Sequence, residues 1–218
     1  MKILISSSEN EILEPIGQLV LANEHELTET EESRPTSLSE MADGFDYVIL
    51  NQSTTVNRRI ISAIENREKI IEFSMAKAPM AQFRNQVISL GMIPEAGEQQ
   101  RKTVSIITDI CREDYDEVVQ DIFSGANFIT QASTKFDSQV SELLVKPYIL
   151  SLLARKVSDL DYIPKTKEYE KMLELSRSVT NYNVDYMRDL IRNNPHTSDI
   201  FSKMEENLKR VWNELSFY

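Results

Sequence analysis

The chain has 218 residues, a hydrophobic content of 41% and a formal net charge of −11. The length allows one large or two small domains with a real core, and the acidic balance argues against nucleic-acid binding, which needs a basic surface to displace counterions from phosphates. The single cysteine, Cys111, excludes an internal disulfide; neither a secretory leader nor a bilayer-spanning apolar run is visible, so a cytoplasmic location without membrane association is expected.

The first half of the sequence alternates short apolar runs with segments of helical periodicity. Strands are predicted over residues 2–5, 25–28, 47–50, 70–73, 87–90, 104–108 and 127–130. Helices are predicted near residues 12–21, 55–66 and 114–123, and the acidic tract TETEES with Pro35 is predicted to be a solvated loop. Strands that alternate with helices need crossover connections, so an α/β fold with a mostly parallel sheet is expected.

The second half is predicted to be helical throughout. The longest apolar-periodic helix runs over residues 133–157, with Ser133 or Thr134 as its cap, Asp137 completing a capping box, and Pro147 bending it near Leu143. A helix follows Pro164, a shorter one is capped by Asn183 and ends before Pro195, and the last begins at Thr197 or Ser198. The last helix carries one apolar stripe, made of Ile200, Phe201, Met204, Leu208, Val211, Trp212 and Leu215. Such wide apolar faces favour pairing with a second copy of the chain.

Three segments resemble blocks of the prephenate dehydrogenase family in order and spacing. They read VISLGMIPEAG, STKFDSQVSELLVKPY and LSRSVTNYNVDYMRDLIRNNP. In that family the blocks contain His-Pro-Met after an apolar run, a His-Asp pair that opens a long helix, and an Arg followed by an aromatic-Asp-Asn segment. The resemblance covers nearly the whole chain, and it depends on three individually weak blocks that occur in register.

The resemblance implies a Rossmann-like domain over residues 1–130 and an all-helical dimerisation and substrate domain over residues 131–218. It also implies a function: NAD- or NADP-dependent oxidative decarboxylation of prephenate to 4-hydroxyphenylpyruvate in tyrosine biosynthesis, by a homodimer. A fold does not by itself carry an activity. The alternative is a catalytically degenerate relative that acts as a dimeric ligand-binding or regulatory protein.

The resemblance assigns roles to residues that also have simpler readings. Arg177 matches the arginine that binds a substrate carboxylate, although Glu170 and Glu174 on the same helix also suit a surface ion pair. Lys77 matches a lysine near the nicotinamide, although a lone loop lysine is usually solvated. Asp137 would orient the substrate or merely cap its helix.

Two further matches are less direct. Tyr148 stands where the family has a helix histidine, and its hydroxyl can donate a hydrogen bond in a catalytic role. The serine that precedes the family lysine corresponds to Ser74 or is replaced by Met75, and Ser74 is the candidate for cofactor binding.

The departures from the family concern its most characteristic residues. The loop after the first strand lacks all three glycines that bring backbone close to a pyrophosphate; the hydroxyls of Ser7 and Ser8 can bind a phosphate, but Glu9 and Glu11 oppose an anion there. Glu9 also suits an ordinary helix N-terminus. The expected catalytic histidine falls on Gly91, and the histidine of the His-Asp pair falls on Phe136. Such a histidine typically contributes about 100-fold to 10,000-fold to a rate.

The remaining chemistry-bearing residues suggest no metal site. His25 and His196 have no Cys, Asp or second His at ligand spacing. Cys111 has only Arg112 as a basic neighbour, so a buried structural thiol is expected rather than a nucleophile.

Overall fold

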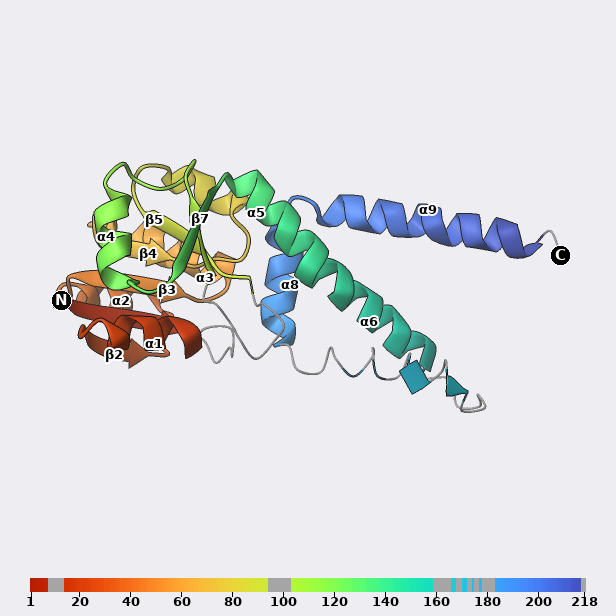
Figure 1. The fold of residues 1–218 in the computed structure, drawn as a ribbon, viewed down its shortest axis with the longest axis horizontal. Coiled ribbons are helices and arrows are strands. Elements are labelled where there is room, and N and C mark those ends of the chain that lie inside the picture. The colour runs from red at the N-terminus through yellow and green to blue at the C-terminus, as the bar shows by residue number, and fades with distance from the viewer. Residues whose placement is uncertain are drawn as a thin grey trace. The chain divides into compact units, whose positions relative to one another are not determined.

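The computed structural model describes residues 1–7, 14–93, 103–158 and 183–216, together with positions 166, 167, 170, 171, 174 and 177. Contacts within the chain divide it into two compact units, Met1–Asp137 and Ser138–Tyr218. The first unit contains the sheet, and the second is helical over its described residues (Figure 1).

A seven-stranded sheet forms the first unit. Its strands are β1 (Lys2–Ser7), β2 (Glu26–Thr30), β3 (Tyr47–Asn51), β4 (Ile70–Glu72), β5 (Ile88–Gly91), β6 (Thr103–Ile107) and β7 (Asn127–Gln131). The order across the sheet is β2-β1-β3-β4-β5-β6-β7. Every neighbouring pair is parallel except β5 and β6. This arrangement confirms the predicted mostly parallel, Rossmann-like sheet, followed by a helical region.

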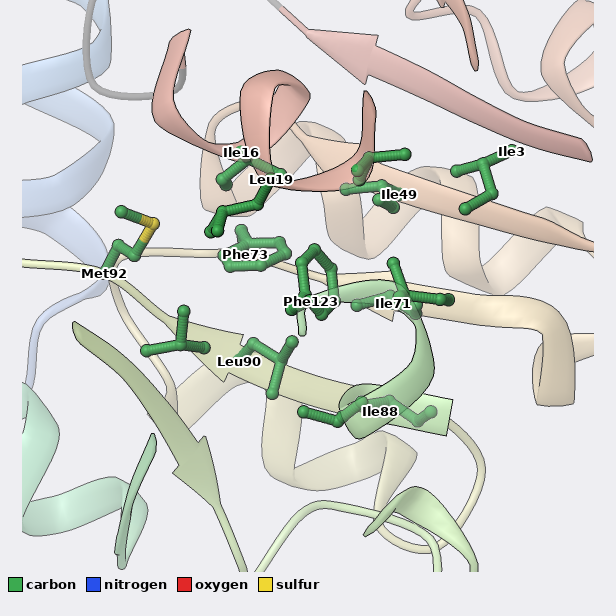
Figure 2. Close-up of a cluster of buried hydrophobic side chains, with 14 of the residues drawn as sticks. Ile3, Ile16, Leu19, Ile49, Ile71, Phe73, Ile88, Leu90, Met92 and Phe123 are labelled. Atoms are coloured by element: carbon green, nitrogen blue, oxygen red, sulfur yellow. The ribbon is translucent and has the colours of Figure 1, made fainter. Parts of the chain in front are cut away.

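The helices α1 (Glu14–Ala22) and α4 (Tyr115–Ile122) close one side of the sheet over a hydrophobic cluster. Figure 2 shows alternate strand residues such as Ile49, Ile71 and Leu90 converging on this cluster. Phe73 and Phe123 meet edge to face in it, with ring centroids 5.8 Å apart. Central strands that are covered on both faces read as continuous apolar runs, and that is why they were predictable.

The helices α2 (Pro35–Ala42) and α3 (Thr54–Ala63) cover the opposite face. The chain moves one way across the sheet from β1 to β2 and the other way from β2 to β3 and β4, so right-handed crossovers place α1 and these two helices on opposite faces. The predicted solvated loop was wrong at both ends. Glu29 and Thr30 of the acidic tract belong to β2, and Pro35 begins α2, because proline suits the first position of a helix. The short 3-10 helix η3 (Ala78–Phe83) was also not predicted.

The helices of the second half follow the predicted order. The helix α5 (Ser133–Val140) leads through a π-helical turn, η4 (Ser141–Val145), into α6 (Lys146–Ser158). The π turn includes Leu143, where a bend was predicted, and it lets the backbone accommodate Pro147, whose ring would otherwise collide with the Leu143 carbonyl.

Two more helices of the second unit are described along their whole length, α8 (Val184–Asn193) and α9 (Thr197–Ser216). Most of the helix predicted after Pro164 lies outside the described residues, and its described positions 167, 170, 171, 174 and 177 are helical. The Asn183 side chain accepts hydrogen bonds from the N–H groups of Asp185 and Tyr186, which confirms the predicted cap. Within the described residues, no helix is both long enough and apolar enough to cross a membrane.

Candidate functional site

The site begins at the carboxyl ends of β1 and β3, where the strand order reverses direction. In open α/β sheets this switch point is the usual place of ligand binding. Ser7 and Asn51 are register partners there, and the Asn51 amide donates to the Ser7 hydroxyl over 3.2 Å. The Gln52 amide donates to the Ser6 hydroxyl over 3.1 Å. The edge is therefore polar, but these groups bond to one another.

Asn57 of α3 extends this polar cluster toward β4. Its side-chain oxygen accepts from the Gln52 N–H over 3.1 Å, and its amide donates to the Ser74 hydroxyl over 2.9 Å. Asn57 and Ser74 are both completely buried. The hydroxyl of Ser74, a candidate for cofactor binding, is thus buried and bonded to a side chain of α3.

Lys77 is buried completely, contrary to the simple reading of a solvated loop lysine. Its ammonium lies 2.9 Å from a carboxylate oxygen of Glu72, which is also fully buried, and donates to the Leu90 carbonyl over 2.6 Å. The Ser74 N–H donates to the other Glu72 oxygen over 2.7 Å, and the Ser89 hydroxyl also donates to Glu72. A buried ion pair is tolerated when its remaining hydrogen bonds are satisfied in this way.

Asp137 holds the loop that carries Lys77. Its two carboxylate oxygens accept from the Lys77 N–H over 2.6 Å and from the Ala78 N–H over 2.9 Å. The first turn of η3 is therefore capped by a residue 60 positions away in sequence. At the start of α5, the Ser133 N–H and hydroxyl donate to Asp109.

Gly91 and Phe136 are in direct contact. A Cβ atom placed on Gly91 would overlap with Cε2 and Cζ of the Phe136 ring and would lie 3.1 Å from its Cδ2. The ring is completely buried, and its centroid lies 5.7 Å from the Lys77 ammonium. These are the two positions at which the family resemblance expects histidines. Here one carries no side chain, and the other fills the space with an apolar ring.

The other predicted site residues are Ser8, Tyr148 and Arg177. Ser8 lies outside the described residues. Tyr148 is buried on α6, and Arg177 is an exposed helical residue. Both belong to the second unit, whereas Ser7, Ser74, Lys77 and Asp137 belong to the first.

The loop after β2 carries a strongly acidic group. Glu32 pairs with Arg34 at 2.7 Å, and its backbone carbonyl accepts from the Ser6 hydroxyl over 2.8 Å. The Arg34 side chain and the N–H groups of Arg34 and Ser33 lower the pKa of Glu32 to about 2. In dinucleotide-binding folds an acidic residue in this region binds the ribose hydroxyls; here the carboxylate is held by Arg34.

Sequence reasoning missed Asn51, Gln52, Asn57 and Glu72. The signal was present for Glu72, since a charge inside the apolar run IIEF must find a buried partner. Cys111, by contrast, agrees with the expected structural thiol: burial raises its pKa to about 11, and it bonds to the Ser89 backbone.

The donors at the switch point suit a nucleotide only in part. The hydroxyl of the half-buried Ser7 and the amide of Asn51 can bond to a phosphate or a ribose. The sequence contains no glycine before Gly17, so no glycine turn brings backbone N–H groups close to a pyrophosphate. The residues therefore do not provide the usual dinucleotide cradle.

Comparison with known proteins finds likeness in structure alone. No protein-family model and no curated protein sequence matches the chain. A proposed prephenate dehydrogenase from Corynebacterium glutamicum is 11% identical, with a TM-score of 0.67 over 96% of this chain and 79% of that one. Prephenate dehydrogenase from Aquifex aeolicus is 10% identical, with a TM-score of 0.66 over 99% and 91%. Synechocystis arogenate dehydrogenase is 9% identical, with a TM-score of 0.61 over 99% and 92%. At these identities the likeness establishes a shared dehydrogenase-type fold.

Proposed function

We propose that the protein is a dehydrogenase-like relative of the prephenate and arogenate dehydrogenases, with NAD or NADP as its cofactor and prephenate or a related acid as its substrate. The observation that carries the proposal is the extent of the structural likeness. It covers 96–99% of this chain and includes both the sheet unit and the helical unit. The A. aeolicus enzyme has been solved with hydroxyphenyl propionate and NAD+.

The polar switch point supports nucleotide binding in the first unit. Ser7 and Asn51 would contact the cofactor there, with Ser8 adjoining Ser7 in sequence. Arg177 is the residue proposed to bind the substrate carboxylate, and Tyr148 the residue proposed to donate a hydrogen bond to the substrate. Lys77 and Asp137 are proposed to position the loop after β4 that carries Lys77, because their charged groups form hydrogen bonds inside the first unit.

A second candidate function is ligand binding without turnover. The contact between Phe136 and Gly91 favours it, because the positions expected to carry histidines are filled by an apolar ring. In this version the dehydrogenase frame would bind an acid or a nucleotide and serve as a binding or regulatory protein. The two candidates differ in one measurable property, the oxidation of substrate.

Pairing of two copies through the C-terminal helices belongs to either proposal. Large apolar side chains of α9 are exposed in the single chain: Phe201, Leu208, Val211, Trp212 and Leu215. An apolar stripe of this size on a helix is suited to a second helix. We therefore propose a cytoplasmic homodimer.

The decisive experiment follows the absorbance of reduced nicotinamide. Prephenate or arogenate is mixed with NAD or NADP and purified protein, and Arg177→Ala and Arg188→Ala variants are compared. The first removes the proposed carboxylate partner; the second removes an exposed arginine of α8 that pairs with Asp185. We expect turnover in the parent protein and in Arg188→Ala. In Arg177→Ala we expect KM to rise about 10-fold to 100-fold, the value of a charge-assisted hydrogen bond.

Folded protein that oxidises neither acid with either cofactor would overturn the dehydrogenase proposal. Melting temperatures then separate the remaining possibilities, because a ligand that binds only the folded state raises the melting temperature. A shift with either acid or with NAD or NADP, in protein that oxidises neither acid, would establish the second candidate. No shift with any of these compounds would exclude both.

A further inference from the structure

A surface groove runs along one face of α3. It is lined by Arg58, Arg59, Ser62 and Ala63 of that helix, by Pro35 at the start of α2 and by Gln82 of η3. It is a shallow depression, open to solvent, with a volume of about 430 Å³. Arg58 with Ser62 and Arg59 with Ala63 are i,i+4 pairs, which are neighbours on the helix surface, and both arginines line the groove. None of these six residues is acidic.

The two arginines are unusual in their surroundings. The other arginines described in the first unit all have partners: Arg34 pairs with Glu32, Arg67 with Gln86, Arg84 with the Asp109 carbonyl and Arg112 with Asp114. Arg58 and Arg59 are exposed, and their guanidinium groups bond to no residue that the structure describes. In a chain with a net charge of −11, two adjoining cations that pair with no carboxylate among the described residues can attract an anion.

We propose that this groove binds a phosphomonoester group. Two guanidinium forks match the geometry and the double charge of a phosphate dianion. The Gln82 amide donates one N–H to the Pro79 carbonyl and has a second N–H for the ligand, whereas the Ser62 hydroxyl donates its proton to the Arg58 carbonyl. The groove lies in the first unit and involves none of Ser7, Asn51 and Lys77, so the inference stands whether or not the protein is a dehydrogenase.

The phosphate can come from two sources. NADP carries a 2′-phosphomonoester that NAD lacks, and Pro35 in the groove directly follows Arg34 in the loop after β2, a region used for the adenosine ribose in dinucleotide folds. The other source is a separate phosphorylated small molecule. Both present the same dianion to Arg58 and Arg59.

The test is calorimetric titration of the full chain with inorganic phosphate, NADP and NAD at constant ionic strength. The variants are Arg58→Gln, Arg59→Gln and their combination. Lys2→Gln/Lys135→Gln is the control, because it removes the same charge from exposed sites outside the groove. We expect each single replacement to weaken phosphate binding roughly tenfold and the double replacement about 100-fold. The control should bind as the parent does.

A charge-preserving variant, Arg58→Lys/Arg59→Lys, separates fork geometry from charge. It should fold as the parent does and lose about tenfold in affinity for phosphate, because lysine cannot form the bidentate contact.

If the 2′-phosphate of NADP is the ligand, NADP binds more tightly than NAD and phosphate competes with NADP. The double glutamine variant then abolishes the difference in affinity between NADP and NAD. If the ligand is a separate molecule, phosphate binds without competing with NADP. The proposal is overturned if phosphate binds the parent and the double glutamine variant with equal affinity. It is also overturned if phosphate does not bind at millimolar concentration and NADP binds no more tightly than NAD.

Discussion

At the scale of single residues, the interior next to Lys77 is governed by the contact between Gly91 and Phe136. Gly91 has no left-handed backbone angle, so its conformation alone would accept an alanine. The obstacle is the ring of Phe136, which lies where the alanine Cβ would be. Any larger side chain at residue 91 therefore requires a smaller one at residue 136, and the two positions must change together.

This coupling predicts the outcome of a double-mutant cycle. Gly91→Ala should destabilise the protein by about 1–3 kcal/mol, the usual cost of overpacking a core. In the Phe136→Leu background the same change should cost much less, which gives a coupling energy of about 0.5–3 kcal/mol. Urea unfolding of the four proteins measures both quantities.

The matched control is Gly44→Ala. The nearest atom to its added Cβ would be the Met41 carbonyl oxygen at 3.7 Å, an ordinary contact. The steric account is wrong if Gly91→Ala is as stable as this control, or if the cost of Gly91→Ala is unchanged by Phe136→Leu.

At the scale of elements, the strands and most helices could be predicted because their patterns are local. The run YVIL is buried along its whole length except for a half-buried first residue, and Asn183 caps α8 as its position indicates. The helix α2 was missed because an acidic tract and a proline resemble a loop, although proline also suits a helix start. The contacts of Asp137 could not be predicted, because its partners, the N–H groups of Lys77 and Ala78, are distant in sequence.

The link from α5 to η3 predicts a graded loss of stability at Asp137. Asp137→Ala leaves the buried Lys77 N–H without its acceptor and should cost about 2–4 kcal/mol in unfolding free energy. Asp137→Asn keeps one oxygen acceptor and should cost about half as much. Hydrogen exchange provides a local readout, since the Lys77 and Ala78 amides should lose protection more than those of β1.

Asp185→Ala on α8 serves as the comparison, because its carboxylate is exposed and pairs only with the exposed Arg188 among the described residues. Such surface pairs contribute about 0–1 kcal/mol. Equal losses in Asp137→Ala and Asp185→Ala, with unchanged exchange at Lys77 and Ala78, would contradict the capping role.

At the scale of the whole molecule, α9 is the element that, among those the structure describes, leaves the most large apolar side chains exposed. Ile200 is buried and Met204 half-buried, whereas Trp212 is 72% exposed and Leu215 is 69% exposed. Phe201, Met204, Leu208, Val211 and Leu215 repeat at alternating intervals of three and four residues, the a/d pattern of paired helices. The stripe was visible in the sequence, but periodicity alone cannot identify what covers it.

We predict that the covering element is the same surface of a second copy. In that case Trp212→Glu and Leu208→Glu should each weaken self-association at least about 30-fold, since a central buried tryptophan or leucine contributes about 2 kcal/mol or more. Sedimentation velocity over a range of concentrations measures the change. Asn213→Glu, at an exposed polar position on the opposite side of α9, adds the same charge outside the stripe and should leave the assembly intact. A parent chain that sediments as a monomer at every concentration would exclude the dimer. If the parent and Asn213→Glu are dimers while the two stripe variants are monomers, the apolar face of α9 is the interface.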